Sequence, residues 1–99
     1  MTINIQYVQI ATSEAMSEYV TNKLKKLSKK YEWIIKADVY FKHEINSKTK
    51  GKVCKMELSL PGPRIFATSN EKNYELAVKE TIKDLIVQLK KRKEIYKTH

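Results

Sequence analysis

The sequence has few residues that break regular structure, and it cannot form an internal disulfide. It contains only two glycines and two prolines, which argues against a loop-rich fold. Its single cysteine, Cys54, excludes an intramolecular disulfide and suits a reducing cytosol. No apolar run approaches the roughly 20 residues that span a membrane, and residues 1–10 alternate instead of forming a signal peptide. We therefore expect a cytoplasmic protein that does not associate with membranes.

Sequence signatures of catalysis and of metal binding are also missing. Gly51 and Gly62 alone cannot build a glycine-rich phosphate loop. His43 and His99 lack the cysteine or carboxylate spacing of a zinc site. Cys54 alternates with apolar positions, as a core residue does, and the acidic residues show no pairing typical of acid–base catalysis. We expect no enzyme activity, no metal and no cofactor.

The charge of the chain is strongly positive and comes almost entirely from lysine. The chain has 20 Lys and Arg residues and 11 Asp and Glu residues, which gives a formal net charge of +9. Phosphate is the commonest partner of so basic a domain, whereas lipid headgroups would be a less specific one. Only Arg64 and Arg92 are arginines, so recognition of the nucleic-acid backbone and shape is favoured over base reading. Nucleic acid is the first partner to consider.

The apolar pattern predicts a single α+β domain with the order β-α-β-β-β-α. Alternation of apolar and polar residues predicts four strands, and helical spacing predicts two helices. The predicted strands cover residues 3–7, 35–44, 54–60 and 65–68, and the helices run from Thr12 or Ser13 to near Trp33 and over 73–96. A polar connection at 45–52 and the Pro61–Pro63 turn separate the later strands.

The order of the elements also predicts how they pack. A right-handed crossover should make the first two strands parallel, and the other strands should follow in antiparallel order. Two helices can cover one face of this four-stranded mixed sheet and leave the other face wet. Tyr40 and Lys42 should lie on the wet face, where the tyrosine either stacks on a base or packs against a neighbouring strand.

Lysines form a row along each predicted helix. In the last helix, steps of seven, four, seven and seven residues keep the row within an arc of roughly 40°. This row is Lys72, Lys79, Lys83, Lys90 and Lys97, and the first helix repeats it with Lys23, Lys26 and Lys30. Ordinary solvated faces with Glu75–Lys79 and Glu80–Lys83 pairs remain an alternative. The run Lys90–Lys93 favours an anionic ligand, because four successive cations repel one another.

Several short motifs, taken together and in order, carry a family resemblance. They are Ser13, Glu18–Val20 and Lys23–Leu27 in the first helix, the Leu60–Gly62 turn, and Glu75–Val78 and Gln88–Lys93 in the second helix. With this topology, the chain resembles the ribosome hibernation-promoting factors, also called ribosome-associated inhibitors, in their short form. The resemblance covers essentially the whole chain.

This resemblance implies a fold like that of double-stranded-RNA-binding domains and a site in the small ribosomal subunit. There the protein would lie between head and body, contact ribosomal RNA and block messenger and transfer RNA in idle ribosomes. The matching positions imply RNA contacts by Lys23, Lys26, Lys83, Lys90, Lys91 and Lys93, and by Arg92. The lysine rows add Lys30 and Lys79. Off the ribosome we expect a monomer.

The sequence departs from the family pattern at two places. Asn73 stands where many members have an acid, and Lys79 replaces a second acid, which adds positive charge. Residues 1–99 are expected to form one ribosome-binding domain, without the C-terminal dimerisation domain of long members. Pairing of ribosomes would then need a separate dimerising factor, and ribosomal proteins are further possible partners. The alternatives are a general double-stranded-RNA-binding module and a basic interaction domain for an acidic protein partner.

Overall fold

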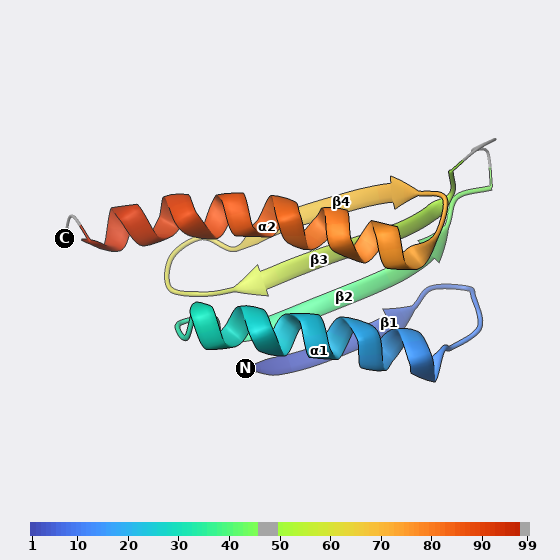
Figure 1. The fold of residues 1–99 in the computed structure, drawn as a ribbon, viewed down its shortest axis with the longest axis horizontal. Helices are drawn as coiled ribbons and strands as arrows, with labels where there is room; N and C mark the ends of the chain where they lie inside the picture. The colour runs from blue at the N-terminus through green and yellow to red at the C-terminus, as the bar shows by residue number, and fades with distance from the viewer. Residues whose placement is uncertain (46–49, 98–99) are drawn as a thin grey trace.

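Four strands form one mixed sheet, and two helices cover one of its faces (Figure 1). The computed structural model describes residues 1–45 and 50–97. Its elements are β1 (Thr2–Tyr7), α1 (Glu14–Lys30), β2 (Lys36–His43), β3 (Lys52–Ser59), β4 (Ile65–Glu71) and α2 (Tyr74–Lys97). The strands lie in the order β1-β2-β3-β4, with β1 parallel to β2 and the other pairs antiparallel. The predicted α+β fold is confirmed.

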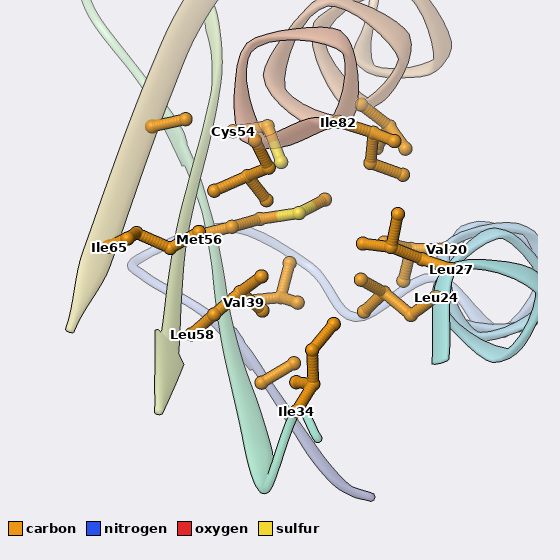
Figure 2. Packing of buried hydrophobic residues seen from close by; sticks show 14 of the residues in the cluster. Val20, Leu24, Leu27, Ile34, Val39, Cys54, Met56, Leu58, Ile65 and Ile82 are labelled. Carbon is orange, nitrogen blue, oxygen red and sulfur yellow. The ribbon is translucent and has the colours of Figure 1, made fainter. Parts of the chain in front are cut away.

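A single apolar core fills the space between the sheet and the two helices (Figure 2). From α1, Val20, Leu24 and Leu27 point toward the strands, as the helical spacing requires. The larger set that meets them is Val39, Met56 and Leu58 from the sheet and Val78, Ile82, Leu85 and Leu89 from α2. Because all these side chains lie on one side of the sheet, the polar residues that alternate with them lie on the other.

Each helix begins at a side chain that accepts a hydrogen bond from its first turn. Ser13 Oγ accepts from the backbone N–H of Met16 at 3.2 Å, so Ser13 is the N-cap of α1. Asn73 Oδ1 accepts from the backbone N–H of Leu76 at 2.8 Å at the start of α2. The residue that replaces the family's acid therefore has a structural role, since asparagine caps a helix as well as aspartate does.

The end of α1 differs from the prediction. The helix ends at Lys30 rather than near Trp33, because the buried Tyr31 leaves helical geometry at its C-cap. The ring of Trp33 then lies edge-on to the rings of Tyr31 and Tyr96, at centroid distances of 5.7 and 4.9 Å. Trp33 thus covers the edge of the core and connects the loop after α1 to the end of α2.

Strand β4 is longer than predicted, and the connection before β3 lies partly outside the described residues. β4 continues to Glu71 because its polar end still pairs with β3, in a register that places Glu71 opposite Lys52. Lys48, in the predicted polar connection, is not among the described residues. Lys50 Nζ lies 3.9 Å from a carboxylate oxygen of Glu71, and Lys52 Nζ lies 5.8 Å from the ring centroid of Tyr74.

Candidate nucleic-acid interface

The lysines of α1 lie on the flank that is turned away from the outer edge of the sheet. On the opposite flank, Ser17 Oγ is 2.9 Å from the hydroxyl of Tyr7, which belongs to the edge strand β1. At about 100° per residue, Lys23, Lys26 and Lys30 fall on the other side of the helix from Ser17. Since α2 lies on that side (Figure 1), these three lysines are turned toward α2.

Three lysines of α2 lie on its exposed side, away from the sheet. Thr81 Oγ1 donates to the carbonyl of Cys54 at 3.1 Å, and Gln88 Nε2 donates to the carbonyl of Phe66 at 2.7 Å. These bonds fix one flank of α2 against β3 and β4. Lys79, Lys83 and Lys90 fall nearly half a turn from Thr81 and therefore lie on the exposed side of α2 that is turned away from the sheet.

We call the lysines that these two neighbouring helices present to their shared exposed surface the interhelical lysine set. Its members are Lys23, Lys26, Lys30, Lys79, Lys83, Lys90 and Lys93. The helices lie side by side over the sheet and start at the same end (Figure 1), so the two rows run next to each other. The sequence could place each row on a helix, but only the packing of α1 beside α2 brings the rows together.

Carboxylates do not neutralise this set in residues 1–45 and 50–97. The ion pairs there are Lys36–Asp38, Lys50–Glu71, Arg64–Glu57 and Lys97–Glu94. The Glu75–Lys79 and Glu80–Lys83 pairs considered from the sequence do not come within 4.0 Å. The Lys23 ammonium instead lies 5.5 Å from the ring centroid of Tyr19, and that of Lys30 lies 5.7 Å from that of Tyr31.

The run from Lys90 to Lys93 does not act as one cluster. Lys90 lies on the side of α2 turned away from the sheet, Lys93 is turned from it toward α1, and Lys91 is turned about 100° from Lys90 in the other direction, toward solvent. Arg92 points into the β3–β4 turn, where Nη1 donates to the carbonyl of Pro61 at 3.0 Å and Nη2 to that of Pro63 at 2.9 Å. Consecutive helix residues cannot share a face, so the linear charge run is divided over three directions.

The Arg92 contacts hold the basic end of α2 in place. The hydroxyl of Tyr96 also donates to the carbonyl of Pro61, which ties two turns of the helix to the same loop. Gly62 between the prolines has φ +92°, and a Cβ there would lie 3.1 Å from Arg92 Nη1. This fit requires glycine, because φ is positive and the guanidinium occupies the space of a side chain. The lysines near the C-terminus of α2 are thus carried by an anchored helix.

Cys54 belongs to the core and not to a reactive site. It is fully buried, and burial raises the pKa of its thiol from 9.0 to about 12, against a smaller lowering by the hydrogen bond with Thr81. The thiolate that would act as nucleophile or metal ligand is therefore suppressed at neutral pH. Among the described residues, no three His, Cys, Asp or Glu side chains are grouped as a metal site requires. Neither helix is long and apolar enough to cross a bilayer, over the same residues.

Cys54 should resist alkylation in the folded protein. At pH 8 we expect iodoacetamide to label Cys54 at least about a hundredfold more slowly in the folded chain than in the chain unfolded in guanidinium. Folding buries the sulfur away from the reagent and lowers the fraction of thiolate. The neutral thiol stabilises the fold fully below about pH 9, and this contribution is lost as the pH rises toward 12. Mass spectrometry of timed samples measures the rate. Equal labelling of the folded and unfolded chains would contradict the buried placement.

Known proteins with this fold share nearly its whole length. The chain is similar to a ribosomal subunit interface protein from Coxiella burnetii, with 26% identity over 95% of this chain and 99% of that one, and a TM-score of 0.83. It is also similar in fold to the N-terminal domain of Protein Y from Thermus thermophilus, with 20% identity over 92% and 98% of the two chains, and a TM-score of 0.78. Comparison with curated protein sequences gave no match.

The sequence also matches a family model over almost its full extent. The match covers residues 3–97, which include both helices and all four strands apart from Thr2 at the start of β1. The model describes the sigma 54 modulation proteins and S30EA ribosomal proteins. This agrees with the resemblance to ribosome hibernation factors that the helix motifs carry, and the chain therefore belongs to this family.

Proposed function

We propose that the chain binds the small ribosomal subunit and inhibits translation by occupying its channel between head and body. The interhelical lysine set would contact ribosomal RNA, with Lys91 as a further contact on the outer side of α2. Arg92 would hold the β3–β4 turn and donate its remaining N–H groups to ribosomal RNA. The folded domain would then exclude messenger and transfer RNA from idle ribosomes in the cytoplasm, without a cofactor or a catalytic step.

One observation carries this proposal: two adjacent helices present seven lysines to a shared surface, and none of the seven has a carboxylate partner within 4.0 Å in the described residues. Unpaired cations in two parallel rows repel one another unless an anion lies between them. Ribosomal RNA supplies phosphates in rows, and their neutralisation releases condensed counterions. Ammonium groups contact the phosphate backbone and recognise the shape of an RNA rather than its bases. This suits a protein that binds one folded RNA surface.

Sedimentation with purified small subunits tests the proposal. The chain should pellet with vacant subunits, and messenger and transfer RNA bound beforehand should prevent this, because the proposed site overlaps theirs. Binding should also weaken steeply as salt is raised. Undiminished pelleting with subunits that already hold transfer RNA would reject occupation of the channel.

Two other functions make different predictions in the same assays. A general double-stranded-RNA-binding module would be displaced by free RNA duplex as readily as by ribosomal subunits. A basic domain that binds an acidic protein would retain this partner in lysate treated with nuclease. The family description includes sigma 54 modulation proteins, which makes a protein partner the second function to test. Ribosomal proteins and a separate dimerising factor remain possible additional partners of the ribosome-bound chain.

A further inference from the structure

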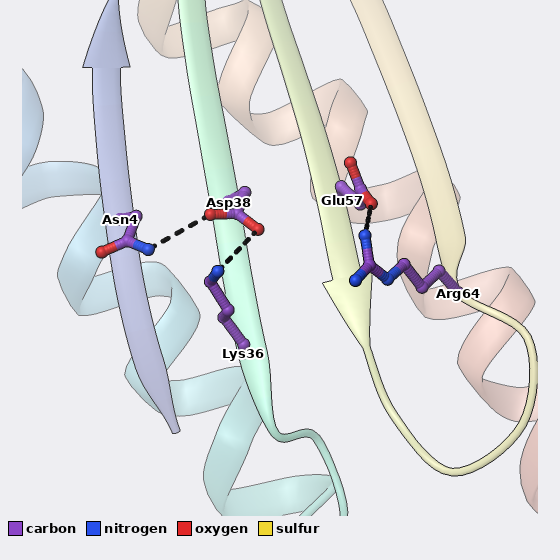
Figure 3. Close-up of polar contacts among 5 residues, drawn as sticks. All are labelled: Asn4, Lys36, Asp38, Glu57 and Arg64. Atoms are coloured by element: carbon purple, nitrogen blue, oxygen red, sulfur yellow. Dashed lines mark hydrogen bonds and ion pairs between the residues drawn. The ribbon is translucent and has the colours of Figure 1, made fainter.

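On the face of the sheet opposite the helices, the carboxylates of Asp38 and Glu57 have basic partners (Figure 3), and the carboxylate of Glu44, after the end of β2, accepts a hydrogen bond from Asn70 Nδ2. Lys36 Nζ lies 3.6 Å from a carboxylate oxygen of Asp38, and Asn4 Nδ2 donates to the same carboxylate at 3.3 Å. Arg64 Nη1 donates to Glu57 at 2.6 Å. The carboxylates of Asp38 and Glu57 are therefore already neutralised by basic side chains.

The same face holds a hollow with cations and an aromatic ring. The hollow has a volume of about 220 Å³ and is lined by Val8, Tyr40, Lys42 and Lys55. The Lys55 ammonium lies 5.9 Å from the ring centroid of Tyr40. Neither lysine has a carboxylate within 4.0 Å among the described residues. The hollow thus combines apolar surface with uncompensated positive charge.

A second hollow of about 200 Å³ adjoins the first and shares Val8 and Lys42 with it. It extends past His43 toward the end of β2. The two hollows form a short path along the sheet rather than a closed pocket for a compact molecule. This geometry fits a chain with a repeating anionic backbone and flat groups attached to it.

We propose that this hollow binds an unpaired nucleotide of an RNA strand. The base would pack on Tyr40 and Val8, and the adjacent phosphates would contact Lys42 and Lys55. Aromatic side chains flanked by cations bind single-stranded RNA in this way, since every base offers a flat face and every nucleotide a phosphate. The hollow lies on the face opposite the interhelical lysine set, so the proposal stands on different residues from those of the proposed ribosome contact.

Binding of a short unstructured RNA, such as fluorescein-labelled hexauridylate, tests the proposal by anisotropy. The measurement uses a background variant with Lys83→Ala and Lys90→Ala, which reduces binding by the helices. Tyr40→Ala should weaken binding about tenfold, as expected for the loss of one stacked base, whereas Tyr40→Phe should bind like the background variant. Lys42→Ala and Lys55→Ala should each lower the slope of log affinity against log salt by about 0.7.

Lys36→Ala is the matched control, because it removes the same charge from the same face at a lysine that already has a carboxylate partner. It should weaken binding less than about twofold. Circular dichroism shows whether each variant is folded. If Tyr40→Ala disrupts the fold, photocrosslinking of the unchanged protein to 5-iodouridine RNA replaces it, and the expected crosslink is at Tyr40.

Two results would overturn the proposal without touching the proposed ribosome contact. One is equal RNA affinity of folded Tyr40→Ala and its background variant, or crosslinks confined to the helices. The other is displacement of the RNA by an acidic peptide at equal charge concentration, which would assign the hollow to a protein partner. Conversely, failure of the ribosome assay with intact binding at the hollow would reject only the proposed function.

Discussion

A variant that lacks four lysines of the interhelical set is expected to bind the small ribosomal subunit at least about a hundredfold more weakly than the unchanged chain. The four, all changed to alanine, are Lys23, Lys30, Lys83 and Lys90. Each lost phosphate contact should also lower the slope of log affinity against log salt by about one. Fluorescence anisotropy of the labelled chain, titrated with subunits at several salt concentrations, measures both quantities.

The first helix offers a matched control for this loss of charge. Lys23→Ala with Lys30→Ala removes two cations from the flank that faces α2, whereas Lys25→Ala with Lys29→Ala removes two from the solvent side of the same helix. The first pair should weaken binding by about tenfold or more, and the second by less than about threefold. Equal effects of the two pairs would mean that net charge, and not the shared surface, governs binding.

Replacing Phe41 by alanine is expected to destabilise the fold by about 3–5 kcal/mol, the cost of removing a large buried side chain. Phe41 is fully buried at the centre of β2, and its ring lies 5.2 Å from that of Tyr7 and 5.6 Å from that of Tyr74. It thus connects β1 to the start of α2. Since domains of this size are stable by only about 5–15 kcal/mol, much of the margin would be lost. Urea unfolding followed by circular dichroism measures the change.

The other phenylalanine provides the comparison. Phe66 lies on the open face of β4 and is 52% exposed, so Phe66→Ala should cost less than about 1 kcal/mol. Phe41→Leu should fall between the two, because it keeps most of the apolar volume and loses the ring contacts. Similar losses for Phe41→Ala and Phe66→Ala would contradict the burial of Phe41 against Tyr7 of β1 and Tyr74 of α2.

The fold could be predicted from the sequence to the extent that local patterns report it. Alternation in Ile3, Ile5 and Tyr7 and helical spacing in α1 and α2 reflect burial of one face, which each segment encodes by itself. The end of β4 was missed because Asn70 and Glu71 are polar, and their strand conformation depends on pairing with β3. The end of α1 was misplaced because Tyr31 keeps the apolar spacing while its backbone already leaves the helix.

The candidate interface, too, was predictable from the sequence pattern only in part, and the rest depends on tertiary packing. The rows predicted from helical periodicity contain every lysine of the interhelical set except Lys93, which the family resemblance supplied. The sequence could not separate Lys91 and Arg92 from their neighbours by role, since the carbonyls of Pro61 and Pro63 that hold Arg92 come from a distant turn. The hollow at Tyr40 likewise needs Val8, which follows β1, and Lys55 from β3 beside it.

By itself, then, the sequence determined a basic α+β domain with a row of lysines along each helix. The tertiary structure decided that the two rows lie on one shared surface, that no carboxylate of the described residues comes within 4.0 Å of the interhelical lysine set, and that Arg92 binds the β3–β4 turn. The physical reason is that periodicity acts within one element, over a few residues. The neighbours of a side chain across elements depend on how the sheet and both helices pack as a whole.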